Sequence, residues 1–387
     1  MNTKLTRRNW LKSSAFLAAG LGVAPALMAS DSTLQPVYKP QIWERNFSFP
    51  SDLQGLRARL LANENPYGPS DEVRLAIMES VSKGNRYGHQ DSVRLKEMLA
   101  EREGVTPDHI MLGPGSTDIL EKTAISHFVS GGNIVSADPS YMSLVKTAMA
   151  FGGSWKNIPL TAAYAHDVSA MRAAIDKKTR LVYVCNPNNP MGSLTPNADL
   201  RKFCAEASEK APVFVDEAYL EFLEEREGKS MVDLVAQGKN VIVARTFSKI
   251  HGMAGLRIGY GVAQPETLEK IRSMVRSNMG LCVTSIRGAM ASLEATAFHE
   301  KTRKLTAESR AYVGEQLQVM GFSYVPSYTS FMIFPIDMPG GDFLDKMFAQ
   351  SIGVRVFEIN DKPWCRVSMG TMDEMKMFIE GLKKTLG

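Results

Sequence analysis

Short apolar segments alternate with helix-like segments through the middle of the chain, and this alternation limits the possible folds more than any other feature. The apolar segments occupy residues 109–112, 132–137, 180–185, 212–216, 240–246 and 257–263. Apolar strands separated by helical patterns are typical of a mostly parallel sheet that is covered by helices on both faces. We therefore predict an α/β fold whose large domain spans residues 60–278.

The remaining segments divide the chain further. Its 387 residues are enough for two cores. Strand-like segments at 330–336 and 365–370 predict a smaller α/β domain at residues 279–387. Near the start of the large domain, Ser70 is expected to cap a helix that continues through Val81, and Ser92 to begin a second helix that continues through Glu103. Residues 31–59 are rich in Pro, Ser and aromatic residues, which predicts an irregular arm or linker.

The first 30 residues have the composition of an export signal. Arg7 and Arg8 precede a run of apolar and small residues from Ala15 to Ala29. The arginine pair resembles the twin-arginine signal, which directs the export of folded proteins. We therefore predict a twin-arginine signal peptide at residues 1–30, the twin-arginine export machinery as a partner, and a periplasmic or secreted mature protein. An ordinary export signal or a short membrane anchor is the alternative interpretation.

Charge and cysteine usage exclude some classes of function. The formal net charge is only +4 and no block of Lys and Arg is present, so we expect no nucleic-acid partner. The four cysteines are widely scattered, and the histidines form no H-x-H or H-x-x-x-H pair. We therefore predict no metal site, and we expect the cysteines to be buried thiols.

Polar segments follow several of the predicted strands. In an open α/β sheet, ligands bind at the carboxyl ends of the strands. A glycine-rich turn at residues 113–118 follows the first strand, "NPNNPMG" at 186–192 follows the third, and "DEAY" at 216–219 follows the fourth. Taken singly, none of these segments identifies a ligand site. The first is also typical of an ordinary βα turn, the second of a tight Asn-Pro loop and the third of a helix cap.

The segment "TFSK" at residues 246–249, followed by "GLRIG", completes a set of motifs that is specific when taken together. Together and in this order, the motifs resemble those of the fold type I pyridoxal-phosphate enzymes, in particular the class I and II aminotransferases. "LANENPYGPS" at 61–70, "NRYG" at 85–88 and "CRVSMG" at 365–370 resemble the histidinol-phosphate aminotransferase branch. The resemblance extends from about residue 60 to the end of the chain.

This resemblance implies pyridoxal 5'-phosphate as the cofactor and Lys249 as the amine that forms a Schiff base with its aldehyde and then moves a proton. Asp216 would face the pyridine nitrogen, and Tyr219 and Asn189 would bond to the 3-hydroxyl oxygen. Tyr141 would stack on the ring. The expected phosphate site consists of Ser116, Thr117, Thr246, Ser248 and Arg257.

Two further roles follow from the same resemblance. Tyr87 would reach across the interface of a homodimer to the phosphate of the partner subunit. Arg366 would clamp the substrate carboxylate through a bidentate pair. We therefore expect catalytic roles for Lys249, Asp216 and Tyr219.

One departure from the family pattern bears on the substrate. Histidinol-phosphate aminotransferases usually carry a second arginine where this chain has Phe357, whereas Arg355 lies two positions earlier and is expected to face the same way. We therefore predict an unphosphorylated amino acid, aromatic or apolar, as the donor and a 2-oxo acid as the acceptor. A pyridoxal-phosphate decarboxylase or lyase is the alternative, followed by a histidinol-phosphate aminotransferase and by a non-catalytic, exported solute-binding protein.

Overall fold

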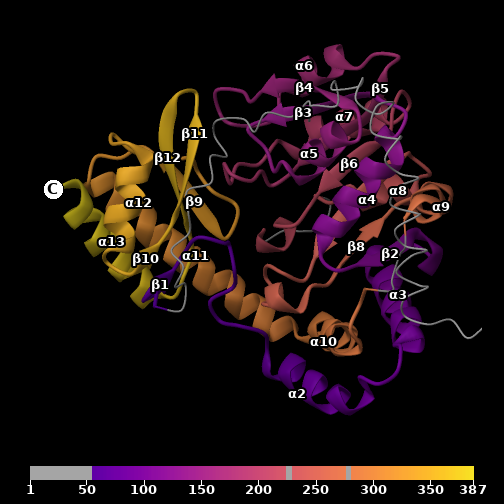
Figure 1. Ribbon diagram of the computed structural model, residues 1–387, viewed down its shortest axis with the longest axis horizontal. Helices are drawn as coiled ribbons and strands as arrows, with labels where there is room; N and C mark the ends of the chain where they lie inside the picture. Colours follow the sequence, from indigo (N-terminus) through magenta and orange to yellow (C-terminus); the bar gives the residue numbers. More distant parts are fainter. Residues whose placement is uncertain (1–54, 224–228, 276–279) are drawn as a thin grey trace, which may run out of the picture. The chain divides into compact units, whose positions relative to one another are not determined.

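A seven-stranded sheet lies at the centre of the computed structural model, which describes residues 55–223, 229–275 and 280–387 (Figure 1). The strands are β2 (Ile110–Gly113), β3 (Gly132–Asp138), β4 (Gly153–Pro159), β5 (Thr179–Cys185), β6 (Val213–Asp216), β7 (Val241–Thr246) and β8 (Gly259–Val262). Their order is β2-β8-β7-β6-β5-β3-β4, and β8 alone runs antiparallel to its neighbours. The prediction of a mostly parallel sheet in an α/β fold is confirmed.

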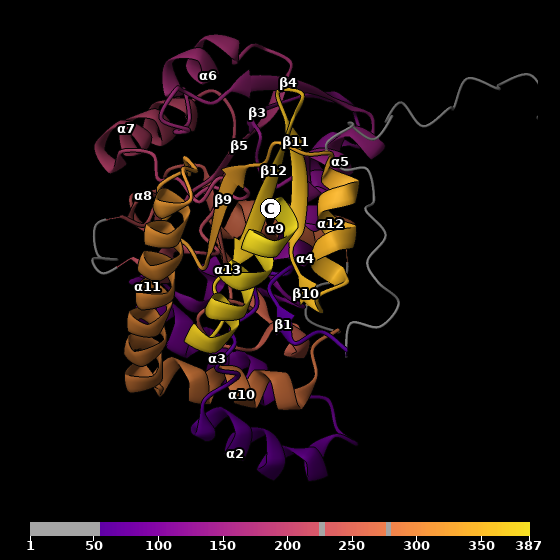
Figure 2. The same ribbon diagram turned by 90° about the vertical axis from the view of Figure 1, so that its left-hand side faces the viewer.

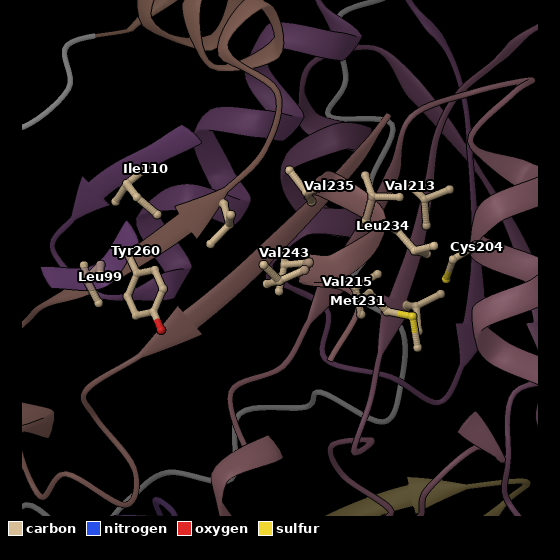
Figure 3. Close-up of a cluster of buried hydrophobic side chains, with 14 of the residues drawn as sticks. Leu99, Ile110, Cys204, Val213, Val215, Met231, Leu234, Val235, Val243 and Tyr260 are labelled. Atoms are coloured by element: carbon tan, nitrogen blue, oxygen red, sulfur yellow. The ribbon is translucent and has the colours of Figure 1, made fainter. Parts of the chain in front are cut away.

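Both faces of this sheet are buried. Along β5, Val182 and Val184 face one hydrophobic cluster, whereas Leu181 and Tyr183 face another. Figure 3 shows the first cluster, in which Val213, Val215 and Val243 of the sheet lie near side chains such as Leu234 and Cys204. Burial of each large aliphatic side chain contributes roughly 1.5–3 kcal/mol, so these two clusters hold the strand ends in place.

Helices connect the strands. They are α3 (His89–Glu103), α4 (Ser116–Phe128), α5 (Ser143–Ala150), α6 (Val168–Ala174), α7 (Asn197–Ala207), α8 (Val232–Ala236) and α9 (Pro265–Met274). Helix α2 (Asp71–Ser80) packs against α10 (Val283–Glu294). Short 3-10 helices lie at Val81–Lys83, Pro107–His109, Leu220–Phe222 and Ala254–Leu256.

The C-terminal part of the chain forms a second sheet. Its antiparallel order is β11 (Arg355–Ile359), β12 (Lys362–Ser368) and β9 (Phe331–Pro335). Helices α11 (Thr296–Val319), α12 (Gly340–Phe348) and α13 (Met372–Leu386) lie beside it (Figure 2). Along β12, Cys365 and Val367 enter the core beneath these helices, so Arg366 points to the opposite face. That face is the one that meets the site described below.

Several local predictions can be compared with the structure. The Ser70 hydroxyl accepts from the backbone N–H of Val73, which confirms the predicted cap of α2. The second helix begins at His89 rather than Ser92. Its N-cap residue is Gly88, which makes no side-chain hydrogen bond to the helix, so no capping signal in the sequence marked the true start. Cys282 is exposed, so the expectation that every cysteine is buried is wrong there.

Three strands, β1, β4 and β10, were not predicted. β4 is an edge strand whose sequence, GSWKNIP, is largely polar, so it lacks the apolar pattern of the central strands. β1 (Ala58–Arg59) pairs with β10 (Ile352–Gly353) in parallel. The predicted arm therefore ends in a strand, and two residues are too few to give a periodic signal.

The remaining organisational predictions stay predictions. The predicted signal peptide and most of the predicted arm lie outside the described residues. The described residues all belong to one unit, so the division at residues 60–278 and 279–387 is not tested. Within the described ranges, no helix is both long enough and apolar enough to cross a membrane.

Candidate active site

A pocket of about 330 Å³ lies at the carboxyl ends of β5, β6 and β7. Cys185, Asp216 and Thr246 are the last residues of these three strands, and each lines the pocket. Arg355, Phe357 and Arg366 of the second sheet line it as well. The pocket therefore lies at the carboxyl ends of the strands, where ligands bind in open α/β sheets, and the C-terminal sheet supplies a further wall.

Lys249 reaches this pocket from the turn that follows β7. Its Nζ donates to the backbone carbonyl of Asn63 at 3.2 Å and lies 5.5 Å from the centre of the Tyr219 ring. Burial, and then the positive charge of Arg366, lower the pKa of the Lys249 amine to about 8. An amine that loses its proton so readily is suited to attack a carbonyl carbon.

A cluster of anion-binding groups lies beside Lys249. Arg257 donates from Nη1 to the Ser248 hydroxyl at 3.3 Å, and that hydroxyl accepts from Thr246 Oγ1 at 3.0 Å. Helix α4 begins at Ser116 with no side-chain cap, so N–H groups of its first turn are available to a ligand. The structure brings together all five residues of the predicted phosphate site.

Gly115 explains how the guanidinium can approach this helix start so closely. Its φ is 89°, a conformation that favours glycine, and an added Cβ would lie 2.4 Å from Nη2 of Arg257. Arg257 also donates from Nη2 to the Pro114 carbonyl at 3.2 Å. The glycine-rich turn therefore serves both the backbone conformation and the close contact.

Asp216 lies buried at the end of β6, where Ala218 N–H donates to its Oδ1 at 3.1 Å. Burial raises the pKa of the Asp216 carboxyl to about 6, while Lys249 and this hydrogen bond act in the opposite direction. A buried carboxylate of this kind gains stability from a cationic partner such as a protonated ring nitrogen.

Arg366 provides a second, separate cation. It donates to Asn189 Oδ1 at 2.7 Å and to the Leu61 carbonyl at 3.2 Å, while its Nε is buried without a hydrogen-bond partner. No carboxylate of the described residues forms an ion pair with it. Burial lowers the pKa of Arg366 to about 9, the penalty of an uncompensated buried charge. A ligand carboxylate would remove that penalty.

Arg355 and Phe357 lie beside Arg366 on the same face of the C-terminal sheet, as predicted. Arg355 is directly opposite Arg366 in the strand register. The Phe357 ring contacts both guanidinium groups, with its centre 5.0 Å from Cζ of Arg366 and 5.4 Å from Cζ of Arg355. Phe357 also belongs to an apolar cluster with Met191, Val325, Ile333 and Ile359.

Of the predicted tyrosines, two line the pocket and one does not. Tyr219 is buried there, and the Tyr141 hydroxyl lies 3.3 Å from Thr117 Oγ1. Tyr87 lies outside the pocket and is 78% exposed. Because its predicted role concerns the partner subunit, that role stays a prediction.

Asn63 is a site residue to which sequence reasoning gave no role. The motif "LANENPYGPS" contains it, but nothing in the motif separates Asn63 from Asn65. In the structure, Asn63 bonds to Lys249, Tyr219 and Ser368. Its partners lie 156 to 305 residues away in the sequence, so only the fold brings them together.

These groups fit one cofactor. The amine of Lys249, the anion site at Arg257 and the Asp216 carboxylate match the aldehyde, the phosphate and the ring nitrogen of pyridoxal 5'-phosphate. Within residues 55–223, 229–275 and 280–387, no group of three or more His, Cys, Asp and Glu is arranged so that it could hold a metal ion.

Comparisons with known proteins give the same result. The family model "Aminotransferase class I and II" matches residues 58–382. Histidinol-phosphate aminotransferase of Moorella thermoacetica is 34% identical over 330 residues, which cover 85% of each chain. Histidinol-phosphate aminotransferase 2 of Carboxydothermus hydrogenoformans is also 34% identical, over 332 residues that cover 85% of this chain and 91% of the relative.

Solved structures share the fold. Histidinol-phosphate aminotransferase from Sinorhizobium meliloti in complex with pyridoxal-5'-phosphate has a TM-score of 0.81 and 25% identity, with 93% of this chain and 99% of that chain covered. L-threonine-O-3-phosphate decarboxylase from Porphyromonas gingivalis has a TM-score of 0.73 over 85% of this chain and 99% of that one, at 19% identity. At that identity the likeness shows the fold alone.

Proposed function

Because this chain belongs to the class I and II aminotransferase family, we propose that it moves an amino group between an unphosphorylated amino acid, aromatic or apolar, and a 2-oxo acid. It is a pyridoxal-phosphate-dependent transaminase with the fold of the type I enzymes, and pyridoxal 5'-phosphate is its cofactor.

When bound, pyridoxal 5'-phosphate supplies an electron-withdrawing ring and an aldehyde carbon that carries the amino group between substrates. The residues of the chain supply the rest. Arg257, Ser248 and the N–H groups at the start of α4 hold the phosphate. Asp216 keeps a proton at the ring nitrogen, and the Lys249 amine, with its lowered pKa, accepts and returns a proton at Nζ.

The buried charge of Arg366 is the main support for an α-amino acid as the donor. This arginine makes no ion pair among the described residues and has an unpartnered Nε at the pocket wall. A planar carboxylate accepts two hydrogen bonds from a guanidinium and removes the cost of burying that charge. Arg366 is therefore proposed to fix the α-carboxylate of the donor and the carboxylate of the acceptor.

The apolar surface beside Arg366 supports an aromatic or apolar side chain on the donor. Phe357 lines the pocket at the position where histidinol-phosphate aminotransferases usually carry a second arginine, which would favour a substrate phosphate. It packs with Met191 and Ile333. A phosphate dianion placed against this ring would lose hydration without gaining hydrogen bonds. An aromatic or branched side chain would instead gain buried contact area.

Histidinol phosphate is the competing donor, and two observations favour it. Relatives at 34% identity carry that name, and Arg355 also lines the pocket. The side-chain centres of residues i and i+2 of a strand are roughly 6.5–7 Å apart, so Arg355 lies further along the wall than an arginine at position 357 would. Decarboxylation or elimination on the same scaffold is a third possibility, and product analysis separates it from transamination.

The substitution Phe357→Arg tests the role of this wall. We expect the ratio of kcat/KM for L-phenylalanine to kcat/KM for L-histidinol phosphate to fall by roughly 10-fold or more, because the variant gains a cation for the phosphate and loses the apolar contact. Val356→Ile, on the other face of the same strand, is the control and should leave the ratio unchanged. A ratio that is the same in Phe357→Arg and wild type would contradict the proposal.

Export through the twin-arginine route is also proposed, on the basis of Arg7 and Arg8 before an apolar run. This route suits a protein that takes up its cofactor before it crosses the membrane. Replacement of both arginines by lysine should retain the cofactor-loaded protein in the cytoplasm, as cell fractionation would detect. Unchanged export would rule out this route.

A further inference from the structure

The geometry points to Asn63 as a positioning residue that turns the hydroxyl proton of Tyr219 into the pocket and holds the Lys249 amine beside it. We propose that Asn63 thereby sets the protonation behaviour of the bound cofactor. This inference uses the family's cofactor and does not depend on which amino acid is the donor.

The backbone of Asn63 is held in an uncommon conformation. Its φ is 52°, in the left-handed region that asparagine, aspartate and glycine tolerate better than other residues. Its N–H donates to the Ser368 hydroxyl at 2.8 Å, and its carbonyl accepts from Lys249 Nζ at 3.2 Å. The backbone alone therefore links β12 to the reactive lysine.

The side chain of Asn63 makes two further hydrogen bonds. Its Oδ1 accepts from the Ser368 hydroxyl at 2.8 Å, and its Nδ2 donates to the Tyr219 hydroxyl oxygen at 2.9 Å. With only 2% of its surface exposed, Asn63 is shielded from competing water. The two side-chain bonds and the two backbone bonds thus tie together Ser368, Tyr219 and Lys249.

The Ser368 hydroxyl fixes which way the amide faces. This hydroxyl already accepts from the Asn63 N–H, so its own proton requires an acceptor, and Oδ1 is that acceptor. Turning the amide over would put a donor in its place and leave a buried proton of Ser368 without this partner. Nδ2 therefore faces Tyr219.

An amide NH₂ group only donates, so the Tyr219 oxygen is the acceptor in this bond. The Tyr219 proton must then point away from Asn63, and Tyr219 lines the pocket. The family resemblance places the Tyr219 hydroxyl against the 3-oxygen of the cofactor. A proton donated there stabilises negative charge on that oxygen, which makes protonation of the neighbouring Lys249 nitrogen less favourable.

The test measures the pH midpoint of the visible absorbance band of the cofactor-loaded protein, without any substrate. Asn63→Gly removes the amide but tolerates the same φ and keeps the carbonyl that faces Lys249. Ser368→Ala releases the Asn63 side chain without touching Tyr219. Asn65→Ala is the matched control, because Asn65 lies in the same loop but bonds to the Ile250 carbonyl and the Tyr67 N–H.

We expect the midpoint to move to higher pH by about half a unit to one unit in Asn63→Gly, the size of one lost hydrogen bond. Ser368→Ala should shift it in the same direction by less, and Asn65→Ala should leave it where it is. A role limited to holding the loop would weaken cofactor binding in all three variants and move no midpoint. An unchanged midpoint in Asn63→Gly, or in Ser368→Ala should the glycine variant fail to fold, would overturn the inference.

Discussion

At the scale of single residues, the site is built from buried charges that lack a partner of opposite sign among the described residues or have only a weak one. Lys249, Arg366 and Asp216 all lie in one pocket, and burial shifts the pKa of each toward its neutral form. Such groups reduce the stability of the fold, and a ligand that pairs with them recovers that loss. In the proposed function, the cofactor and the substrate carboxylate would supply the missing charges.

The pKa of Lys249 leads to a prediction about cofactor attachment. Only the uncharged amine reacts, so the rate at which pyridoxal 5'-phosphate attaches to the cofactor-free protein should rise with pH and level off above about pH 8. Burial is the largest cause of the shift and the like charge of Arg366 is the next. Arg366→Met removes that charge, so the pKa of Lys249 should rise and the midpoint should move to higher pH, by roughly one unit.

Stopped-flow absorbance across a pH series would measure this midpoint. The surface substitution Arg94→Met is the control, since Arg94 pairs with Glu97 on the exposed side of α3. Equal midpoints in Arg366→Met and wild type would show that burial, or another neighbouring charge such as Arg257, accounts for the shift.

Residue roles could be predicted where a motif fixed them. Asp216 ends one predicted strand and Lys249 follows another, so their convergence at one sheet edge followed from the fold class. Arg257 lies before β8, and it reaches the same edge because β8 runs antiparallel to its neighbours. Asn63 could not be found in this way. Its contacts depend on how residues 61–65 lie against β12 and against the loop after β6, and no local pattern encodes that arrangement.

At the scale of secondary-structure elements, the start of α4 is the proposed anchor for the phosphate. Ser116 and Thr117 of its first turn line the same pocket as Arg257, and Gly115 permits the close approach of the guanidinium. Central strands such as β5 and β6 were predictable because most of their residues are apolar. β1 and β4 were not, because one has two residues and the other is a polar edge strand.

Gly115→Ala tests the role of this turn. The added Cβ would lie 2.4 Å from Arg257 Nη2, so we expect the affinity for pyridoxal 5'-phosphate to fall by roughly 10-fold as the guanidinium is displaced. Gly104→Ala is a matched control, because its φ is 69° but no atom lies within 4 Å of the added Cβ. Both variants should lose about 1 kcal/mol of stability, since alanine is disfavoured at positive φ.

Titration of each protein with the cofactor, followed by thermal unfolding, would separate the two effects. Loss of affinity in Gly115→Ala alone supports the account. Equal affinities in the two variants would show that the contact between Gly115 and Arg257 does not shape the phosphate site.

At the scale of the whole molecule, the described chain leaves apolar surface exposed near its predicted subunit interface. Leu75, Met78, Val81 and Val93 on and between α2 and α3 are all more than half exposed, and Tyr87 lies between these helices. Exposed apolar residues gathered in one stretch are typical of protein–protein contacts. We propose that a second copy of this chain covers them and receives Tyr87 at its phosphate site.

The assembly and the role of Tyr87 can be tested together. Sedimentation of the cofactor-loaded protein should give the mass of a homodimer, and Met78→Glu should shift it toward the monomer. Tyr87→Phe should weaken cofactor binding by about 1 kcal/mol, one hydrogen bond, without changing the mass. Tight cofactor binding by a monomer would contradict this assembly.

The proposed reaction can be tested directly, because Lys249 and Arg366 are proposed to serve the transamination of an unphosphorylated aromatic or apolar amino acid. We would mix the cofactor-loaded protein with L-phenylalanine or with L-histidinol phosphate, follow the loss of the visible band in a single turnover, and identify the product. We expect faster conversion of L-phenylalanine, with phenylpyruvate as the product and no release of carbon dioxide. Faster conversion of L-histidinol phosphate, or release of carbon dioxide from L-phenylalanine, would overturn the proposed function.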